Sequence, residues 1–332
     1  MNWIEVNGTG LRYELSGGGP STLVLIHEMG GTLDSWDQGL SALNNGRLVL
    51  RYDTRGAGLS EKINGAVTWN DMADDLKALL DTLHITGRVA IAGIAVGAAI
   101  GVHFAVRYPD RAAALVLHGP ATGVSAERRQ QTIERAATVE SGGMRSVVET
   151  SLANSYPPVV RHDADVFRQF RARWLANDPQ SFAAINRMLA GEDISHELAK
   201  IDCPTLVTAG RHDGLRPRSV IEPMAKQIPG AEFLELNTGH FASIQTPGVM
   251  SQAIHYFLHA KGLYALGEPH DDIGPILTHS AAVLITEEEI RWECWMARLP
   301  SLPGLVEELG ARQRSPSPPM ARRSSLTMSV RA

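Results

Sequence analysis

The sequence has few cysteines. Cys203 and Cys294 are the only two among 332 residues, and they lie far apart along the chain. Two distant thiols exclude a disulfide framework and a clustered thiolate metal site. We therefore expect a reducing compartment and a cytoplasmic protein. Because Cys203 stands just before Pro204 and an apolar run, we interpret it as a small core residue.

The sequence also lacks the segments that direct a protein to a membrane or anchor it there. Residues 1–6 carry neither the basic nor the apolar part of a signal peptide. The one long apolar stretch, Val89–Val106, contains glycines and His103 and changes from a strand pattern to a helix pattern. These features favour a buried core segment over a membrane span. We expect no membrane partner.

An excess of one charge is missing as well. The 31 basic and 36 acidic residues give a net charge of −5 and are spread along most of the chain. This distribution excludes the basic face of a nucleic-acid-binding protein. We expect a small neutral or anionic molecule as the partner and no nucleic acid.

Motifs for cofactors and metals are absent from the sequence. No expected strand runs into a G-x-G-x-x-G turn, so a dinucleotide site is excluded. His255 and His259 stand four residues apart, a spacing that could hold a metal, but no further ligand motif accompanies them. We interpret both as surface histidines and predict neither a cofactor nor a metal.

What the sequence does contain is an alternation of short apolar runs and helical patterns over its first 120 residues. This alternation predicts an α/β fold with a mainly parallel sheet covered by helices on both faces. The Asn7-Gly8 pair predicts an antiparallel hairpin at the start. A capping-box-like spacing from Thr68 to Asp71 predicts the start of a helix. The expected strands are 3–6, 11–15, 23–26, 48–52, 89–92, 113–117, 205–208 and 232–236.

The same patterns divide the chain. Strand signals stop between residues 121 and 200, where charged helical segments such as 126–138 and 164–176 predict a helical cap. The core of the fold is therefore expected to comprise residues 1–120 and 201–262. Residues 263–332 have a composition that cannot bury a core, and we expect this extension to be largely disordered, with a possible helix over 281–299.

The most informative stretch is a strand that runs through G-x-A-x-G into a helix, with Gly93, Ala95 and Gly97 as the fixed positions. This pattern is typical of a nucleophile elbow, in which the central residue sits in a strained turn and the flanking glycines leave room beside it. Here the central residue has no hydroxyl or thiol. On its own the pattern is weak, because a plain contact between helix and strand would also explain it.

Further motifs follow at suitable places and in a suitable order: His27–Gly31, Arg51–Ser60, Gly210–Asp213 and Gly239–Phe241. Together with the elbow, they strongly resemble the α/β-hydrolase superfamily. Among its branches, the chain looks most like the 3-oxoadipate enol-lactonase group of small esterases and lactonases. The resemblance covers roughly residues 2 to 261. It implies an eight-stranded, mostly parallel sheet with a helical cap, and a small ester or lactone as substrate.

The resemblance also implies roles for individual residues. The order nucleophile, acid, histidine maps onto Ala95, Asp213 and His240. His240 would be the general base, and Asp213 would fix its tautomer. The backbone N–H groups of Met29 and Val96 would form the oxyanion hole.

Other residues are weaker candidates for the substrate pocket. They are His27, Glu28, Trp36, His118, Trp174, Arg187 and Met188. Glu28 is expected at the mouth of the pocket or, preferably, in solvent. Arg187, Arg211 or Arg216 could bind a substrate carboxylate. Asp53, Arg55 and Ser60 are interpreted as structural, and Ser60 is not expected to be a nucleophile.

Alanine at the elbow leaves three hypotheses open. Ala95 could be an engineered replacement of Ser or Cys in a working hydrolase. It could instead be natural, with His240 acting directly as a base in non-covalent hydrolysis, elimination, isomerisation or cyclisation. Finally, the chain could be a pseudoenzyme that binds a small ligand. In each case the sequence predicts little or no ordinary acyl-enzyme chemistry.

Overall fold

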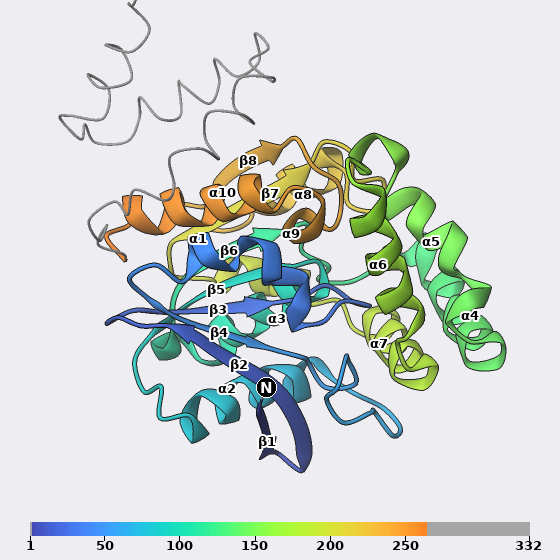
Figure 1. Cartoon of the computed structure of the whole chain (residues 1–332), viewed down its shortest axis with the longest axis horizontal. Coiled ribbons are helices and arrows are strands. Elements are labelled where there is room, and N and C mark those ends of the chain that lie inside the picture. Colours follow the sequence, from blue (N-terminus) through green and yellow to red (C-terminus); the bar gives the residue numbers. More distant parts are fainter. Residues whose placement is uncertain (1, 264–332) are drawn as a thin grey trace, which may run out of the picture. The chain divides into compact units, whose positions relative to one another are not determined.

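A computed structural model describes residues 2–263 of the chain as a single α/β unit (Figure 1). Eight strands form one sheet, in the order β1-β2-β4-β3-β5-β6-β7-β8. The strands are β1 (Asn2–Val6), β2 (Thr9–Gly17), β3 (Thr22–Ile26), β4 (Leu48–Tyr52), β5 (Val89–Ile94), β6 (Ala112–His118), β7 (Thr205–Gly210) and β8 (Glu232–Leu236). The predicted eight-stranded sheet is confirmed, and β4 and β8 have the predicted bounds.

The sheet opens antiparallel and continues parallel. Asn7 and Gly8 adopt positive φ angles of 49° and 68° in the turn between β1 and β2, as the predicted hairpin requires. Strand β2 is also antiparallel to β4, whereas all pairs from β4 to β8 are parallel. The carboxyl ends of the parallel strands therefore meet at one edge, where ligand sites of such sheets are found.

The central strands are buried along their whole length. Every residue of β5 and β7 is buried, and both strands are rich in apolar side chains. Continuous apolar strands need cover on both faces. Helix α2 (Trp69–Thr82) lies on one side of the strands and α10 (Pro247–Ala260) on the other in Figure 1.

Local signals in the sequence set the helix ends. Thr68 and Asp71 form a reciprocal capping box at the start of α2. Helix α3 ends at Arg107, shortly before Pro109. Outside the segment between β6 and β7, the helices besides α2 and α10 are η1 (Leu33–Gly39), α1 (Leu40–Leu43), α3 (Val96–Arg107), η2 (Pro109–Arg111), α8 (Arg218–Ala225) and α9 (Ala242–Gln245).

Helices alone fill the segment between β6 and β7. They are α4 (Ala126–Gly142), η3 (Met144–Ser146), α5 (Val148–Ser155), η4 (Pro158–Val160), α6 (Ala164–Leu175), α7 (Pro179–Gly191) and η5 (Ser195–Lys200). Figure 1 shows α4–α7 together at one end of the sheet. Apolar side chains of this segment form a second cluster, including Tyr156, Phe170 and Trp174, which also contains Phe241 from the core. The predicted disorder of residues 263–332 and the possible helix over 281–299 fall outside the described residues, apart from Leu263.

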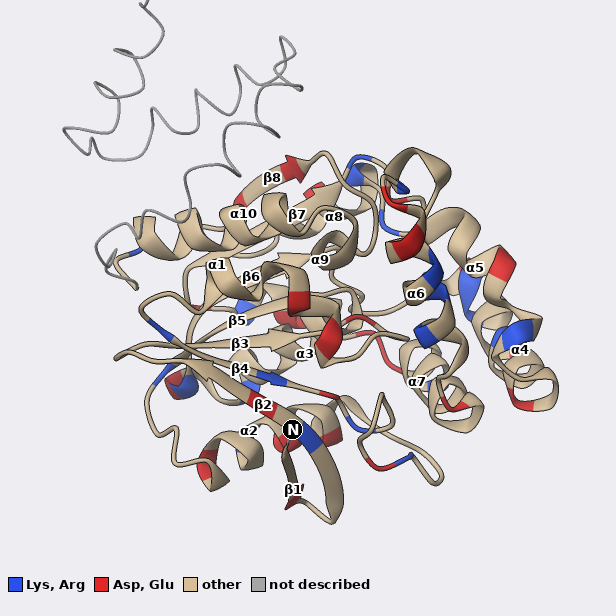
Figure 2. Ribbon diagram, viewed as in Figure 1, with Lys and Arg blue, Asp and Glu red and all other residues tan. Residues whose placement is uncertain are grey.

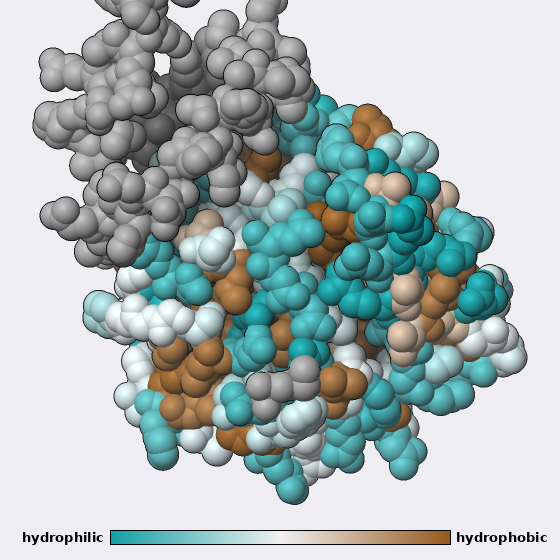
Figure 3. Space-filling view, viewed as in Figure 1, coloured by the Kyte–Doolittle hydropathy of each residue, from teal (hydrophilic) through white to brown (hydrophobic). Residues whose placement is uncertain are grey.

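Charged, hydrophilic and apolar residues are interspersed on the face of the molecule that Figures 2 and 3 show. Basic and acidic residues are interspersed over the elements in Figure 2. Apolar residues appear in Figure 3 as separate patches among hydrophilic ones, and exposed large side chains include Trp3 and Leu59. None of the helices in residues 2–263 combines the length and the apolar character needed to cross a membrane.

Candidate active site

The turn between β5 and α3 holds Ala95 in a strained conformation. Its φ and ψ angles are 52° and −108°, and its exposed fraction is 3%. Residues other than glycine rarely adopt a positive φ, and such strain persists only where the surroundings impose it. The Ala95 N–H donates to the His118 carbonyl at 2.9 Å, and the Ala95 carbonyl accepts from the Ala121 N–H at 3.0 Å. The backbone of β6 and the segment after it therefore fix this turn.

Two glycines make the turn possible. A Cβ atom on Gly93 would lie 2.5 Å from the Gly97 carbonyl, and one on Gly97 would lie 2.4 Å from the His27 carbonyl oxygen. Both distances are far below van der Waals contact, so only glycine lets strand, turn and helix approach this closely. The close approach agrees with the spacing of the G-x-A-x-G pattern.

A histidine and an aspartate meet in the loops that follow β7 and β8. The Nδ1 atom of His240 lies 2.7 Å from Oδ2 of Asp213, and both side chains are buried. The other carboxylate oxygen of Asp213 accepts from the backbone N–H groups of Leu215 and Arg216, at 2.8 and 2.9 Å. Two of the sequence-predicted catalytic side chains are thus brought together.

The surroundings of Asp213 favour its ionised form. Burial opposes ionisation, but the adjacent His240 and the Arg216 N–H outweigh it and lower the pKa of Asp213 to about 2. A carboxylate only accepts hydrogen bonds, so Nδ1 of His240 is the donor. In the neutral imidazole, Nε2 is then the atom with a lone pair and can accept a proton.

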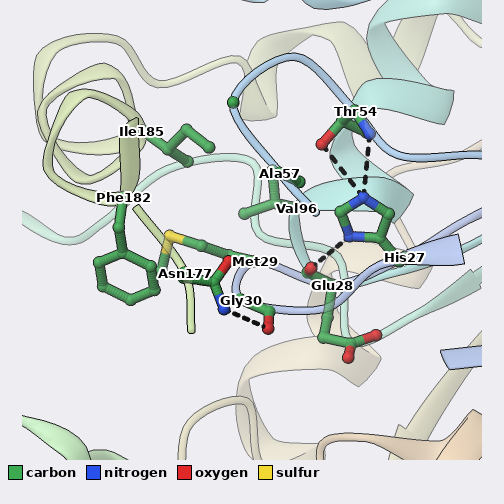
Figure 4. Close-up of a pocket in the computed structure, with 11 residues that line it drawn as sticks. His27, Glu28, Met29, Gly30, Thr54, Ala57, Val96, Asn177, Phe182 and Ile185 are labelled. Carbon is green, nitrogen blue, oxygen red and sulfur yellow. Dashed lines mark hydrogen bonds between the residues drawn. The ribbon is translucent and has the colours of Figure 1, made fainter. Parts of the chain in front are cut away.

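The loop after β3 faces the start of α3 across a small pocket (Figure 4). Backbone N–H groups of both sequence-predicted donors, Met29 and Val96, have no acceptor within the described part of the chain. The His27 ring braces the loop, because Nε2 accepts from the Thr54 N–H at 3.0 Å and Nδ1 donates to the Glu28 carbonyl at 2.7 Å. The pocket is lined by His27, Glu28, Met29, Gly30, Thr54, Gly56, Ala57, Val96, Asn177, Phe182 and Ile185.

The preferred position of Glu28, in solvent, is wrong. Glu28 has an exposed fraction of 0%, and its Oε1 accepts from the Ser35 hydroxyl at 3.0 Å. Its carboxylate points away from Phe182 and Ile185 in Figure 4. Gly31 leaves the room for this arrangement, because a Cβ there would lie 2.2 Å from Oε1. The side chain therefore turns inside its own loop.

Three other predicted pocket residues lie outside the pocket walls. Trp36 has an exposed fraction of 1% and packs in the main core. His118 is fully buried at the end of β6. Trp174 packs edge-on against Phe182, with their ring centroids 5.4 Å apart, and is not among the residues that line the pocket. The two tryptophans therefore contribute to the apolar clusters and not to the pocket surface.

The predicted pocket arginines have other neighbours. Arg187 and Met188 line a different pocket, on another face of α7, where Arg187 pairs with Glu140. Arg211 lies 3.6 Å from Glu235 in an ion pair, and Arg216 donates to the Gly123 carbonyl at 2.9 Å. None of these four residues lines the pocket beside Met29 and Val96.

Sequence reasoning missed part of the pocket wall. Thr54 follows β4 at the carboxyl edge of the sheet, the position where a side chain of a parallel sheet reaches a ligand site. Asn177 donates to the Gly30 carbonyl at 2.9 Å and immediately precedes the Asp178 cap of α7. Phe182 and Ile185, three residues apart, share one face of that helix. The spacing of Phe182 and Ile185 indicates that they share a helix face. The sequence does not show that this face of α7 turns toward the pocket.

Several structural interpretations are confirmed. Asp53 accepts from the Leu33 and Leu59 N–H groups and from Arg12, and the Ser60 hydroxyl donates to the Asp53 carbonyl. Arg55 pairs with Asp75. Cys203 is buried, which raises the pKa of its thiol to about 11.

The comparison with protein families agrees with this geometry. A family model described as serine aminopeptidase, S33, matches residues 20–236, more than half of the chain. The chain belongs to this family. The match extends from just before β3 to the end of β8, so it contains the turn at Ala95 and the acid loop at Asp213.

Individual relatives are similar to the chain over most of its length. An esterase from Thermogutta terrifontis, solved with malate bound, is 27% identical to the chain with a TM-score of 0.74. The match covers 80% of this chain and 100% of the esterase chain. The enol-lactonase from Burkholderia xenovorans LB400 is 28% identical with a TM-score of 0.73, covering 78% and 100%. The 3-oxoadipate enol-lactonase 2 of Acinetobacter baylyi (strain ATCC 33305 / BD413 / ADP1) is 24% identical over 70% of this chain and 86% of its own.

These findings confirm the coarse prediction from the motifs. The chain is an α/β hydrolase of the esterase and lactonase type, with an eight-stranded, mostly parallel sheet. Of the similar proteins, one is described as an esterase and one as an enol-lactonase, and these names refer to ester and lactone bonds of small molecules.

Proposed function

We propose that the pocket beside Met29 and Val96 is a hydrolase site for small esters or lactones in which Ala95 stands at the nucleophile position. The observation that carries this proposal is the strained Ala95 backbone, with φ 52°, at the start of α3. Such a turn lifts the central side chain over a helix N-terminus. The buried His240–Asp213 pair supports the same assignment, since both follow in the expected chain order.

The methyl group of Ala95 decides the chemistry. It offers no lone pair, so no acyl-enzyme forms at this position. The N–H groups of Met29 and Val96 remain available to a substrate carbonyl oxygen, where they stabilise developing negative charge. A hydrolase stripped of its nucleophile keeps about 10³–10⁴-fold acceleration over water from such groups. The chain is therefore proposed as a disarmed hydrolase with weak residual activity.

A second candidate function follows from the intact acid–base pair. Asp213 holds His240 in the tautomer whose Nε2 accepts a proton, and this does not depend on the residue at position 95. His240 would then remove a proton from water or from an acidic substrate without a covalent intermediate. Under this alternative, His240→Gln abolishes the activity of the chain as it stands.

The helices between β6 and β7 are proposed to be the cap of this site. Asn177, Phe182 and Ile185 come from this segment and line the same pocket as His27 and Met29. The acyl or leaving group of a substrate would then contact Phe182 and Ile185. Substrate preference is accordingly expected to respond to changes on α7 more than to changes on the strands.

The test compares the given chain with Ala95→Ser and Ala95→Cys on p-nitrophenyl acetate and on the aryl lactone dihydrocoumarin. We expect either substitution to raise kcat/KM by orders of magnitude. The matched control is the double variant Ala95→Ser with His240→Gln, which carries the hydroxyl but no base and should stay near the parent rate. If neither single variant exceeds the parent, the proposal is wrong. In that case, activity of the parent that His240→Gln removes would favour the second candidate.

A further inference from the structure

His118 connects the two halves of the proposed site, although it lies outside the pocket. It is the last residue of β6, and its side chain has an exposed fraction of 0%. Its backbone carbonyl accepts from the Ala95 N–H at 2.9 Å. Its ring Nε2 lies 3.0 Å from the carbonyl oxygen of Gly239, the residue before His240. One residue therefore touches both the strained turn and the histidine loop.

The hydrogen-bond partners define the state of the His118 ring. The Gly239 carbonyl can only accept, so Nε2 carries the proton and donates. Nδ1, 2.9 Å from the Thr208 hydroxyl on β7, then accepts from that hydroxyl in a neutral ring. Burial lowers the pKa of His118 to about 4, which agrees with a neutral ring near pH 7.

The polarity of His118 has no packing explanation. Its neighbours along β6, Val116 and Leu117, are apolar and fully buried, as this central strand requires. A buried imidazole is tolerated only when both nitrogens are satisfied, and here one of the two partners is the backbone beside His240. The Gly239 carbonyl is an acceptor in a loop, where a shift of the backbone would move the following side chain.

We propose that His118 is a positioning residue that sets the place of His240 through the Gly239 carbonyl. The hydrogen bond from Nε2–H of His118 fixes the loop before His240, and the backbone of His118 fixes the turn at Ala95. The distance between His240 and position 95 is thereby held constant. The catalytic part of this proposal rests on the proposed function, because only a hydrolase needs His240 in a fixed place. The geometric part, His118 acting on the His240–Asp213 hydrogen bond, does not require turnover.

The ring offers a matched pair of substitutions. The amide nitrogen of Gln reaches about as far as Nε2, whereas Asn reaches only as far as Nδ1. His118→Gln therefore keeps the donor to Gly239, and His118→Asn loses it. His103→Gln serves as a control, because His103 is another buried histidine, bonded to Glu197 and Asn70 and remote from the site's hydrogen bonds.

The first readout uses the chain as it stands. The proton between His240 Nδ1 and Asp213 gives a far-downfield proton resonance when the bond is short and buried. We expect this resonance to stay in place in His118→Gln and in His103→Gln, and to shift or broaden in His118→Asn. An unchanged resonance in a folded His118→Asn protein overturns the proposal, because the ring would then only pack.

The second readout uses the Ala95→Ser background. There we expect His118→Asn to lower kcat roughly 10- to 100-fold, with KM nearly unchanged, as misplacement of a base does. His118→Gln should recover most of kcat. Equal kcat for the Asn and Gln variants contradicts the proposal. If Ala95→Ser itself is inactive, the proposed function fails, while the resonance still decides the role of His118.

Discussion

His240 and Asp213 are joined by a 2.7 Å hydrogen bond from Nδ1 to Oδ2, in a chain whose residue 95 is alanine. The carboxylate also accepts two backbone N–H groups, so it is held from both sides. This pair has the geometry of an acid–base system ready to work on a nucleophile. Under the proposed function, the pair lacks only a hydroxyl or thiol at position 95 to act on.

The role of Asp213 is testable once a nucleophile is restored. In the Ala95→Ser background, Asp213→Asn should lower kcat by about 10⁴-fold, because the amide favours the wrong imidazole tautomer. Steady-state kinetics on p-nitrophenyl acetate measures the change. The control is Asp53→Asn, which changes a buried carboxylate after β4 that contacts Arg12 rather than His240. A smaller loss in Asp213→Asn than in Asp53→Asn would contradict the assignment.

His118 should make stability depend on pH. Burial lowers the pKa of His118 to about 4 in the fold, below the ordinary histidine pKa of 6.5, so the unfolded chain binds more protons between these values. Stability contributed by the neutral ring is thus present above pH 6.5 and is lost as the pH falls toward 4. The loss amounts to at most about 3 kcal/mol.

Urea unfolding between pH 7.5 and 4.5 measures this dependence. His118→Gln should show a shallower decline than the parent, since Gln does not titrate. Some decline should remain, because burial also lowers the pKa of His255 to about 4. Identical slopes for the parent and His118→Gln would mean that His118 titrates normally.

The glycine after the turn should tolerate no side chain. Gly97→Ala places a Cβ 2.4 Å from the His27 carbonyl oxygen, which is backbone and cannot move aside. We expect the free energy of unfolding to fall by about 1–3 kcal/mol or more. Gly248→Ala, also in a helix, meets nothing within 4 Å and should be neutral or slightly stabilising. Thermal unfolding compares the Tm of Gly97→Ala with that of Gly248→Ala. Equal Tm values would contradict the prediction, because they would show that the turn can relax around the added Cβ.

The buried carboxylate of Glu28 depends on one hydroxyl. Ser35→Ala removes the Ser35 donor and leaves Glu28 without a side-chain partner among the described residues. An unsatisfied buried acceptor destabilises by about 1–3 kcal/mol. Ser41→Ala, on the exposed side of α1, should change stability by about 0.5 kcal/mol or less. Chemical denaturation of both proteins compares them, and a loss no larger in Ser35→Ala would mean that Glu28 finds another donor.

The sequence allowed the frame of the site to be predicted, since backbone requirements leave clear marks. Gly93 and Gly97 are needed by close contacts that no other residue permits, and Asp213 and His240 follow strands whose ends meet at one edge. Each of these signals is local to a strand end or a turn. Periodicity located the flanking strands to within a few residues.

The walls of the pocket could not be predicted in the same way. Trp36 and Trp174 were suitable by size, but they fill the two apolar clusters. Phe182 faces the pocket while Met188 on the same helix faces another, a difference fixed by the rotation of α7 and not by its pattern alone. Glu28 turned inward because Gly31 and Ser35 make room and supply a donor. Such choices depend on tertiary contacts between distant segments.

The most direct test of the central claim is intact-mass analysis after exposure to diethyl p-nitrophenyl phosphate, which labels activated serine nucleophiles covalently. We expect one diethylphosphoryl group on the Ala95→Ser variant, at position 95 by peptide mapping, and none on the parent protein. Labelling of the given chain at another residue such as Ser60, or no labelling of a folded Ala95→Ser protein, would contradict the claim that Ala95 occupies the nucleophile position.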